Sequence, residues 1–231
     1  MRVLTWNLFH GRSQPPAGTD LQAYFAAALA SWPWDTALLQ EVPPWWPAPL
    51  ARACEAEHRD APTSRNAGLW LRRAIAVRWP DAIKSNAGGC NAVLARLPIL
   101  EHHTLRLRIV PERRVAQLVR LQDRTCLVNF HASAREALAE EELAVLWERA
   151  LAFSDGAPLV LGGDLNLRRP SPPFDDVAHV ASRDVDHVFA RGLVRRAPAL
   201  RLDRKVAVGA RTVELSDHVP LMAALSTPPP P

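Results

Sequence analysis

Short apolar runs that end in polar residues recur along the chain, a pattern typical of buried strands whose ends reach a surface. The first runs from Val3 to Trp6 and the second from Thr36 to Gln40, where Glu41 follows directly. Both runs are β-prone and are bounded by Gly or Pro, so we expect two short buried strands. Asp20 can cap a helix over residues 21–30 between them. The pattern therefore predicts a strand, a helix and a second strand.

The middle of the chain alternates between helical and β-prone patterns. The proline pair at 43–44 suits the first turn of a helix that continues through Ala53, and the mixed apolar and Arg positions of residues 69–79 indicate another. Four β-prone stretches then crowd together, and we expect them to form a meander: residues 92–94, 105–110, 115–121 and 126–130.

The clearest helix pattern comes next, because apolar residues from Leu143 to Leu151 line one face while Glu140, Glu148 and their charged neighbours mostly occupy the other. A short strand over 159–161 follows, stopped by two glycines before Asp164. Two further strands are expected over 185–189 and 219–225. Strands in runs that are interrupted by helices predict two sheets packed face to face with helices outside.

Length and composition fit one folded domain over residues 1–226, followed by a loose Pro-rich tail over 227–231. Apolar residues make up 48% of the 231 residues and are interspersed with charge, which disfavours disorder. No apolar run approaches the ~18 residues that a membrane span requires. The N-terminus has no signal-like pattern, so we expect the mature chain to start at Met1.

The cysteines and the net charge add weaker indications. Three widely spaced cysteines without a C-x-x-C pair argue against a disulfide framework or a zinc cage, so we expect a cytoplasmic protein. A formal charge of +4 favours polyanionic partners. However, Lys84 and Lys205 are the only lysines, and a chain rich in Arg, Ala and Pro is equally well explained by a GC-rich genome.

Candidate chemistry gathers at the strand ends. Seven polar residues follow or adjoin the short apolar runs: Asn7, Glu41, His131, Asp164, Asn166, Asp217 and His218. Strand ends at one edge of a sandwich are places where distant parts of a chain converge on a pocket. Carboxylates and amides supply the hard oxygen ligands that Mg²⁺ prefers, and His supplies a titratable ring. Such a set predicts metal-assisted hydrolysis of a phosphate ester.

The surrounding strings make a resemblance recognisable. In chain order they are Thr5-Trp6-Asn7, Leu39-Gln40-Glu41, Asn91-Ala92-Val93-Leu94-Ala95-Arg96, Asn129-Phe130-His131, Gly163-Asp164-Leu165-Asn166, Asp186-His187-Val188-Phe189 and Ser216-Asp217-His218-Val219-Pro220. Each string alone is common, but the whole series resembles the endonuclease/exonuclease/phosphatase family from residue 5 to 220. The resemblance implies an α/β fold, a four-layer αββα sandwich of two mixed sheets like that of pancreatic deoxyribonuclease.

The resemblance also implies roles. Glu41 would be the main ligand of Mg²⁺ or Mn²⁺, with Asn7 and Asp217 as further metal-site residues. His218 would be the general base or would orient the attacking water, and Asp186 would hold its ring. In other family mechanisms His218 contacts the phosphate and Asp164 activates water, so both assignments stay open.

Three further residues complete the implied catalytic set. Asp164 and Asn166 would flank the attacked phosphorus, whereas the bland alternative for them is an ordinary turn. His131 would donate to a phosphate oxygen or to the leaving group, with Asn129 in support, although a lone His on a strand is often structural. Glu41, too, has the alternative of a surface or helix-capping carboxylate.

The chain departs from the family where many nucleases carry a phosphate-contacting Tyr after the segment that matches residues 96–99. Here Glu101-His102-His103 follows, and Tyr24 is the only tyrosine. His103 or Arg114 could replace the missing donor, and Arg65 and Asn66 lie where family members recruit substrate contacts. All four could equally be exposed polar residues without a role.

These observations predict a monomeric metal-dependent phosphoesterase, with a nuclease as the leading hypothesis because of the basic pI and the Arg-rich segment 191–204. A phosphatase or phosphodiesterase for small molecules or lipid head groups is the enzymatic alternative. Trp45 and Trp46 could then form an exposed lip for lipid, although core packing is the simpler interpretation. A non-catalytic binding protein that kept the fold is the third hypothesis.

Overall fold

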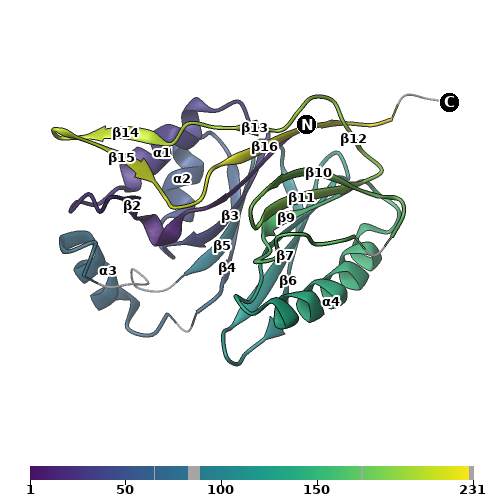
Figure 1. Ribbon diagram of the computed structural model, residues 1–231, viewed down its shortest axis with the longest axis horizontal. Helices are drawn as coiled ribbons and strands as arrows, with labels where there is room; N and C mark the ends of the chain where they lie inside the picture. The colour runs from purple at the N-terminus through teal and green to yellow at the C-terminus, as the bar shows by residue number, and fades with distance from the viewer. Residues whose placement is uncertain (65, 83–88, 173, 229–231) are drawn as a thin grey trace.

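The computed structural model describes residues 1–64, 66–82, 89–172 and 174–228. Two β-sheets pack face to face, and helices cover both outer faces, so the chain forms a four-layer α/β sandwich (Figure 1). The architecture expected from the sequence is therefore confirmed.

The first sheet is built around a parallel pair of strands. Its strands lie in the order β12 (Val194–Arg195), β16 (Leu221–Ser226), β1 (Arg2–Asn7), β3 (Thr36–Val42), β5 (Cys90–Ala95) and β4 (Glu57–Pro62), and β13 (Leu200–Arg201) also pairs with β16. Strands β1 and β3 are parallel, while the pairs that involve β16, β5 and β4 are antiparallel. Helix α1 (Gln22–Ser31) connects the parallel pair, and α2 (Pro47–Ala53) follows β3.

The second sheet repeats this plan. Its order is β10 (Val177–Arg183), β11 (Asp186–Arg191), β9 (Leu159–Asp164), β8 (Cys126–His131), β7 (Arg114–Leu121) and β6 (Ile99–Arg108). Strands β8 and β9 are parallel, and helix α4 (Glu136–Ser154) connects them. The remaining elements are η1 (Phe9–Gly11), α3 (Leu69–Arg78) and a small sheet of β14 (Lys205–Val208), β15 (Arg211–Leu215) and β2 (Ser13–Gln14).

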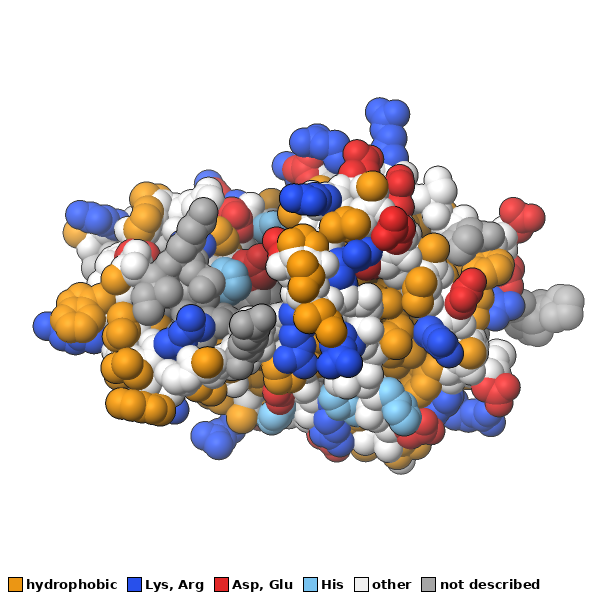
Figure 2. Space-filling model, turned by 90° about the horizontal axis from the view of Figure 1, so that it is seen from below, with side chains coloured by type: hydrophobic (Ala, Val, Ile, Leu, Met, Phe, Trp, Pro, Cys, Tyr) orange, Lys and Arg blue, Asp and Glu red, His pale blue; other side chains and the backbone are white. Residues whose placement is uncertain are grey.

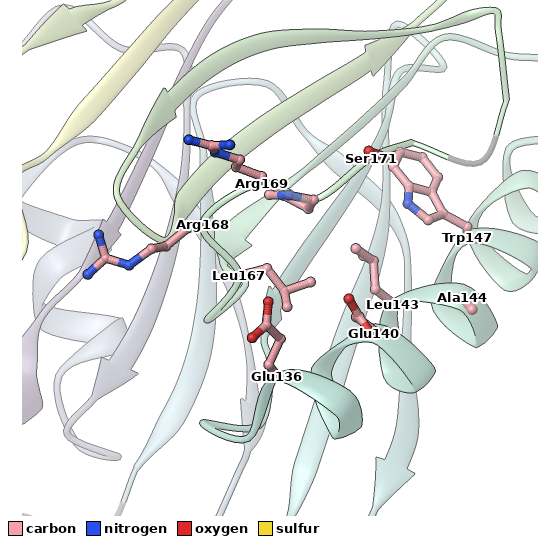
Figure 3. Close-up of a pocket in the computed structure, with 10 residues that line it drawn as sticks. Glu136, Glu140, Leu143, Ala144, Trp147, Leu167, Arg168, Arg169 and Ser171 are labelled. Carbon is pink, nitrogen blue, oxygen red and sulfur yellow. The ribbon is translucent and has the colours of Figure 1, made fainter.

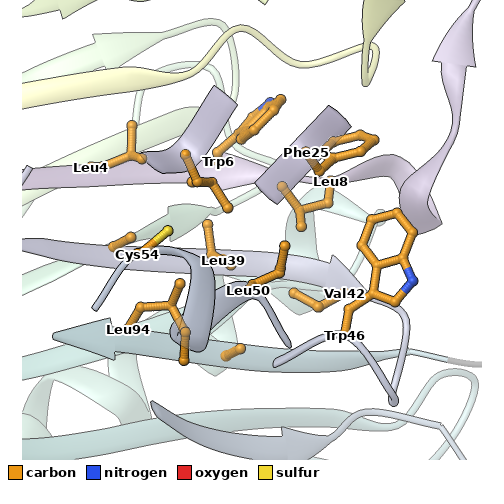
Figure 4. Packing of buried hydrophobic residues seen from close by; sticks show 14 of the residues in the cluster. Leu4, Trp6, Leu8, Phe25, Leu39, Val42, Trp46, Leu50, Cys54 and Leu94 are labelled. Carbon is orange, nitrogen blue, oxygen red and sulfur yellow. The ribbon is translucent and has the colours of Figure 1, made fainter. Parts of the chain in front are cut away.

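Three hydrophobic layers hold the sandwich together. The first lies between the first sheet and helices α1 and α2, where Leu4 and Trp6 pack with Phe25 and Trp46 (Figure 4). The second lies between the sheets, and the third lies under α4. Because Trp46 is 1% exposed, core packing rather than an exposed lip describes its ring, while Trp45 is half-buried.

Alternation along the strands decides which residues face the space between the sheets. In β1, Leu4 and Trp6 face the helices, whereas Val3 faces the other sheet. The two-residue period of a strand then directs Asn7 to the same side as Val3. By the same rule, Asp164 at the end of β9 lies on the same face as Val160, which packs between the sheets. Polar residues thus meet where the inter-sheet layer opens.

The structure corrects several element predictions. Strand β5 lies in the first sheet, so the expected meander consists of β6, β7 and β8 only. Helix α2 begins at Pro47 rather than at the proline pair 43–44. Strand β9 continues through both glycines to Asp164 instead of stopping before them. Strands β4 and β10 were not predicted, because their polar alternation is irregular.

Two further findings bear on the composition. Among the described residues, no helix is both long and apolar enough to cross a membrane. Cys54, Cys90 and Cys126 are all buried and unpaired with one another.

Candidate active site

The end of the inter-sheet layer brings the two sheets into direct polar contact. Asn7, at the end of β1, donates from Nδ2 to Oδ2 of Asp164 at 2.9 Å, and both side chains are almost fully buried. The Oδ1 atom of Asn7 accepts from the backbone N–H of Phe9, which fixes the orientation of the amide. One predicted metal-site residue therefore lies against one predicted catalytic carboxylate.

A local irregularity in β3 turns Glu41 toward this site. Simple alternation from Leu39, which packs under the helices, would point Glu41 away from the other sheet. The pairing of β3 with β5 instead shifts register between Leu39 and Val42, and Glu41 has a positive φ of 50°. Such a bulge re-aims a side chain, and strained backbone of this kind clusters at functional sites. The Glu41 carboxylate consequently reaches the same cleft as Asp164.

His218 and Asp186 form a close ionisable pair at the site. The Nδ1 atom of His218 lies 2.8 Å from Oδ2 of Asp186, and its Nε2 atom lies 3.7 Å from Oδ2 of Asp164. Burial disfavours the charged ring, but the hydrogen bond and the negative charge of Asp186, helped by Asp164 and Asp217, outweigh it and raise the pKa of His218 to about 9. The ring is therefore an imidazolium at neutral pH.

His131 differs from His218 in its protonation. Its Nε2 atom lies 3.5 Å from Oδ2 of Asp164, and its Nδ1 atom lies 4.0 Å from Oε1 of Glu41. Burial lowers the pKa of His131 although both carboxylates oppose the shift. His131 is thus a neutral ring at neutral pH, able to donate one N–H and accept at the other nitrogen.

The segment after Gly163 holds the second half of the site. Gly163 has a φ of 147°, and a Cβ atom there would overlap the carbonyl oxygen of Phe130 in the neighbouring strand. Glycine is required because β8 and β9 approach closely at this point. Asp164 Oδ1 then accepts from the N–H of Asn166 at 3.1 Å, and Asn166 Nδ2 donates to Ala132 O at 2.9 Å. This turn also directs Asn166 to the cleft.

A cleft of about 820 Å³ joins these residues, and we refer to it as the main cleft. Its walls include Glu41, His131, Asp164, Asn166 and His218 together with Asn66, Arg72, Arg113 and Arg114. Figure 2 shows acidic and histidine side chains together in a hollow of this face, with arginines nearby. A phosphate ester entering the cleft would therefore meet guanidinium groups beside the carboxylates and imidazoles.

Sequence reasoning missed His10. This residue lies in η1, just after β1, and its Nε2 atom is 3.1 Å from Oε2 of Glu41. His10 also lines the main cleft and has a positive φ of 53°. The sequence feature that could have indicated a role for His10 was its position three residues after Asn7, which ends β1.

The other predicted substrate contacts are placed unevenly. Asn66 and Arg114 line the main cleft, and Arg114 pairs with Glu112. His103 lies on β6 with its side chain 65% exposed and its ring against Phe153, so the structure does not bring it to the cleft. Arg65 lies outside the described residues.

Asn129 also lies away from the substrate space. It has no exposed surface and sits between the sheets, where Nδ2 donates to Leu39 O, Ala92 O and Gln117 Oε1. Its Oδ1 atom accepts from Gln40 Nε2 at 2.8 Å. The amide therefore ties the two sheets together directly beneath the site instead of facing a ligand.

A second opening lies on the other side of His218. A cavity of about 330 Å³, which we call the side cavity, is lined by Asp186, Asp217 and His218 together with Arg168, Arg183 and Arg204. Asp217 Oδ1 lies 3.9 Å from His218 Nε2. His218 thus belongs to both openings, and arginines border each of them.

The donor atoms of the site suit a hard divalent cation. Among the described residues, Asp164, Asp186 and His218 offer ligand atoms within 4.8 Å of one another. In that group the Nδ1 atom of His218 is already bonded to Asp186, whereas Glu41 in the main cleft offers two carboxylate oxygens. Carboxylate oxygens are the ligands that Mg²⁺ and Mn²⁺ prefer.

Residues 4–218 match the sequence profile of the Endonuclease/Exonuclease/phosphatase family, which the ordered strings of the sequence also resemble. This match identifies a hydrolase that acts on phosphoester bonds. The chain belongs to this family.

Solved structures share the fold at low sequence identity. An endonuclease/exonuclease/phosphatase from Beutenbergia cavernae is 19% identical with a TM-score of 0.74, covering 98% of this chain and 71% of that one. Truncated TDP2 from Caenorhabditis elegans is 15% identical with a TM-score of 0.69, and 96% of each chain is covered. Mannosyl-6-phosphatase from Bacteroides thetaiotaomicron is 15% identical with a TM-score of 0.70, covering 98% of this chain and 99% of that one. A search of curated proteins found no match.

Proposed function

We propose that this protein is a Mg²⁺- or Mn²⁺-dependent phosphodiesterase that cleaves nucleic acid. The observation that carries the proposal is the His218–Asp186 pair facing Asp164 at the junction of two arginine-bordered openings. A positively charged ring, a carboxylate and nearby guanidinium groups are the groups that a phosphodiester undergoing attack requires.

Glu41 is the proposed main metal ligand, with Asn7 and Asp217 as supporting residues. The bound cation would polarise a phosphoryl oxygen and neutralise charge that develops during hydrolysis. Asn7 supports the site through Asp164, to which its amide donates. The bulge at Glu41 supports a functional role for its carboxylate rather than a helix-capping one.

The protonation states favour one of the two open mechanisms. Because the pKa of His218 is raised to about 9, its ring is a hydrogen-bond donor at neutral pH rather than a base. We therefore assign His218 to a phosphoryl oxygen and Asp164 to the attacking water, with Asn166 holding the turn beside Asp164. Neutral His131 is assigned as the donor to a phosphate oxygen or to the leaving group.

Nucleic acid is the preferred substrate because arginines flank the site on both sides. Arg72, Arg113 and Arg114 border the main cleft, while Arg168 and Arg183 border the side cavity beyond His218. A phosphodiester strand extends in both directions from the cleaved bond, and Arg is suited to its phosphates. A small phosphomonoester would use only one side. The resemblance in fold to a mannosyl-6-phosphatase keeps small substrates as the alternative.

We further propose that residues 1–226 act as one monomeric, cytoplasmic domain. The three buried, unpaired cysteines support a reducing compartment.

A metal-by-substrate screen tests the function. Labelled DNA and RNA, bis(p-nitrophenyl) phosphate and p-nitrophenyl phosphate are incubated with Mg²⁺ or Mn²⁺, using the native protein and Asp164→Ala. Asp175→Ala is the matched control, because Asp175 is an exposed carboxylate that lines neither opening beside His218. We expect nucleic acid cleavage that is lost in Asp164→Ala and kept in Asp175→Ala.

Two results would contradict the proposal at different levels. Turnover of small phosphoesters without cleavage of DNA or RNA would exclude the nucleic acid substrate but keep the phosphoesterase. Equal activity of the native protein and Asp164→Ala on every substrate would exclude the catalytic assignment and favour a binding protein.

A further inference from the structure

A third cavity is lined by residues that directly follow residues of the main cleft in the chain. This cavity, which we call the α4 cavity, has a volume of about 380 Å³ and lies between α4 and the segment that follows Asn166 (Figure 3). Glu136, Glu140, Leu143 and Trp147 come from the helix, and Leu167 to Ser171 form the opposite wall. Its volume falls within the range of about 300–1,000 Å³ that small-molecule sites occupy.

The chain connects the two openings at two points. Asn166 lines the main cleft and the next residue, Leu167, lines the α4 cavity. Ala134 likewise lines the main cleft, two residues before Glu136 at the rim of the α4 cavity. A ligand that extends from the catalytic groups would therefore need to pass only one turn of chain to enter the α4 cavity.

The α4 cavity combines an apolar floor with one N–H donor and two carboxylates. Leu143, Trp147 and Leu167 are buried and form the apolar part. The indole Nε1 of Trp147 is buried without a hydrogen-bond partner in the described part of the chain, and Figure 3 shows it on the cavity side of the ring. A buried donor of this kind favours a ligand that supplies an acceptor. The carboxylates of Glu136 and Glu140, two exposed residues of the lining, are available as hydrogen-bond acceptors.

Arginines lead from His218 to the α4 cavity. A fourth cavity of about 310 Å³, the arginine cavity, is lined by Arg168, Arg169, Arg183 and Arg201 together with Ser182 and Asp184. It shares Arg168 and Arg183 with the side cavity at His218, and Arg168 and Arg169 with the α4 cavity. Asp184 contacts two of the guanidinium groups, at 3.7 Å and 3.9 Å, and four arginines against one carboxylate leave the cavity strongly cationic. Such a cavity suits a phosphate.

We propose that one nucleotide adjacent to the cleaved bond binds here, with its phosphate in the arginine cavity and its base in the α4 cavity. This inference rests on the proposed function. Carboxylates accept from the exocyclic amino groups of cytosine or adenine, while thymine and uracil have a carbonyl at the matching edge. The N–H of Trp147 would donate to a ring nitrogen or carbonyl of the same base. The site would therefore favour an amino-bearing base at one position of the strand.

Base preference is the test. Single-stranded oligonucleotides that carry cytosine or thymine at one position at a time are cleaved by the native protein, by Glu136→Gln/Glu140→Gln and by Glu148→Gln. Glu148 is the matched control, an exposed carboxylate of α4 that does not line the α4 cavity. We expect the native kcat/KM to be about tenfold higher with cytosine at one position next to the cut, the effect of one specific polar contact to a base. The double variant should lose that preference, and Glu148→Gln should retain it.

A second variant tests the phosphate half of the site. Arg169→Ala/Arg201→Ala should raise KM for the oligonucleotides several-fold and weaken the dependence of KM on salt, because fewer phosphates are neutralised. Hydrolysis of bis(p-nitrophenyl) phosphate should stay unchanged, since this ester cannot reach the arginine cavity while it occupies the main cleft.

The possible outcomes separate the two proposals. Cleavage without any base preference, or with a preference that survives Glu136→Gln/Glu140→Gln, would overturn the nucleotide site and leave the nuclease intact. Binding of the oligonucleotides is measured by fluorescence anisotropy. Turnover of the small diester, with neither cleavage nor binding of oligonucleotides, would overturn both the nucleotide site and the nuclease. Equal melting temperatures of all variants would exclude misfolding as the cause of either result.

Discussion

Replacing Gly163 by alanine should be one of the most damaging single-methyl changes in this protein. The new Cβ atom would overlap the carbonyl oxygen of Phe130 and lie 2.9 Å and 3.2 Å from the carbonyl carbon and the nitrogen of that residue. The backbone φ of 147° adds strain for any residue other than glycine. Backbone strain of about 1–2 kcal/mol and overpacking of about 1–3 kcal/mol give a loss of roughly 2–5 kcal/mol. Because Phe130 is backbone-paired in β8, it can yield only if β8 and β9 separate.

Gly156→Ala is the matched control for this change. Gly156 also has a positive φ, 77°, but a Cβ atom there would meet nothing within 4 Å. Thermal unfolding followed by circular dichroism should show a decrease in melting temperature of about 4–20 °C for Gly163→Ala, against about 2–8 °C for Gly156→Ala. Equal decreases would refute the steric part of the reasoning. A folded Gly163→Ala protein should also lose activity, because the change separates Asp164 from His131.

Three further changes test the site and the core. Asp186→Asn removes the carboxylate that holds His218 charged, so the pKa of that ring should fall from about 9 to its ordinary value of about 6.5 or lower, and an NMR titration that still gives 9 would contradict the assignment. Glu41→Gln should weaken Mg²⁺ binding at least about tenfold in isothermal titration calorimetry, and unchanged affinity would exclude Glu41 as a ligand. Asn129→Ala should lower the free energy of unfolding in urea by about 3 kcal/mol, since it leaves buried amides and carbonyls without partners, and a loss below about 1 kcal/mol would show that the sheets do not depend on this amide.

Much of the fold could be predicted because the buried strands are apolar on both faces and end abruptly in polar residues. The residues from Thr36 to Gln40 and from Leu159 to Leu161 show this pattern, and both form strands of the sandwich. Helix α4 was equally clear because its apolar face is long. Strand β4 escaped prediction because E-H-R-D shows no apolar alternation, and its place depends on pairing with β5.

The candidate site was predictable where a polar candidate residue ends an apolar strand. Asn7, His131 and Asp164 are of this kind, since the two-residue period carries each of them to the inter-sheet side. Glu41 reaches the cleft only through a bulge that the sequence does not announce. His103 was misplaced among the cleft candidates because strand β6 runs along an outer edge of the second sheet, away from the strand ends that matter.

Asn129 illustrates a further limit of sequence reasoning. Its position next to His131 made it a candidate for substrate contact, but alternation places the two side chains on the same face at different depths. His131 is at the mouth of the inter-sheet layer, whereas Asn129 lies one step deeper and binds Gln40 and Gln117. Depth within a layer depends on how the sheets are stacked, and a single strand does not encode it.

Each sheet contributes half of the site from its own parallel strand pair. Asn7 and Glu41 end or follow the β1–β3 pair, while His131 and Asp164 end the β8–β9 pair. His131 belongs to the second sheet, whereas the Glu41 carboxylate that faces it belongs to the first. The candidate site therefore exists only while the two sheets are docked, so a change that separates them should abolish activity without removing any of these residues.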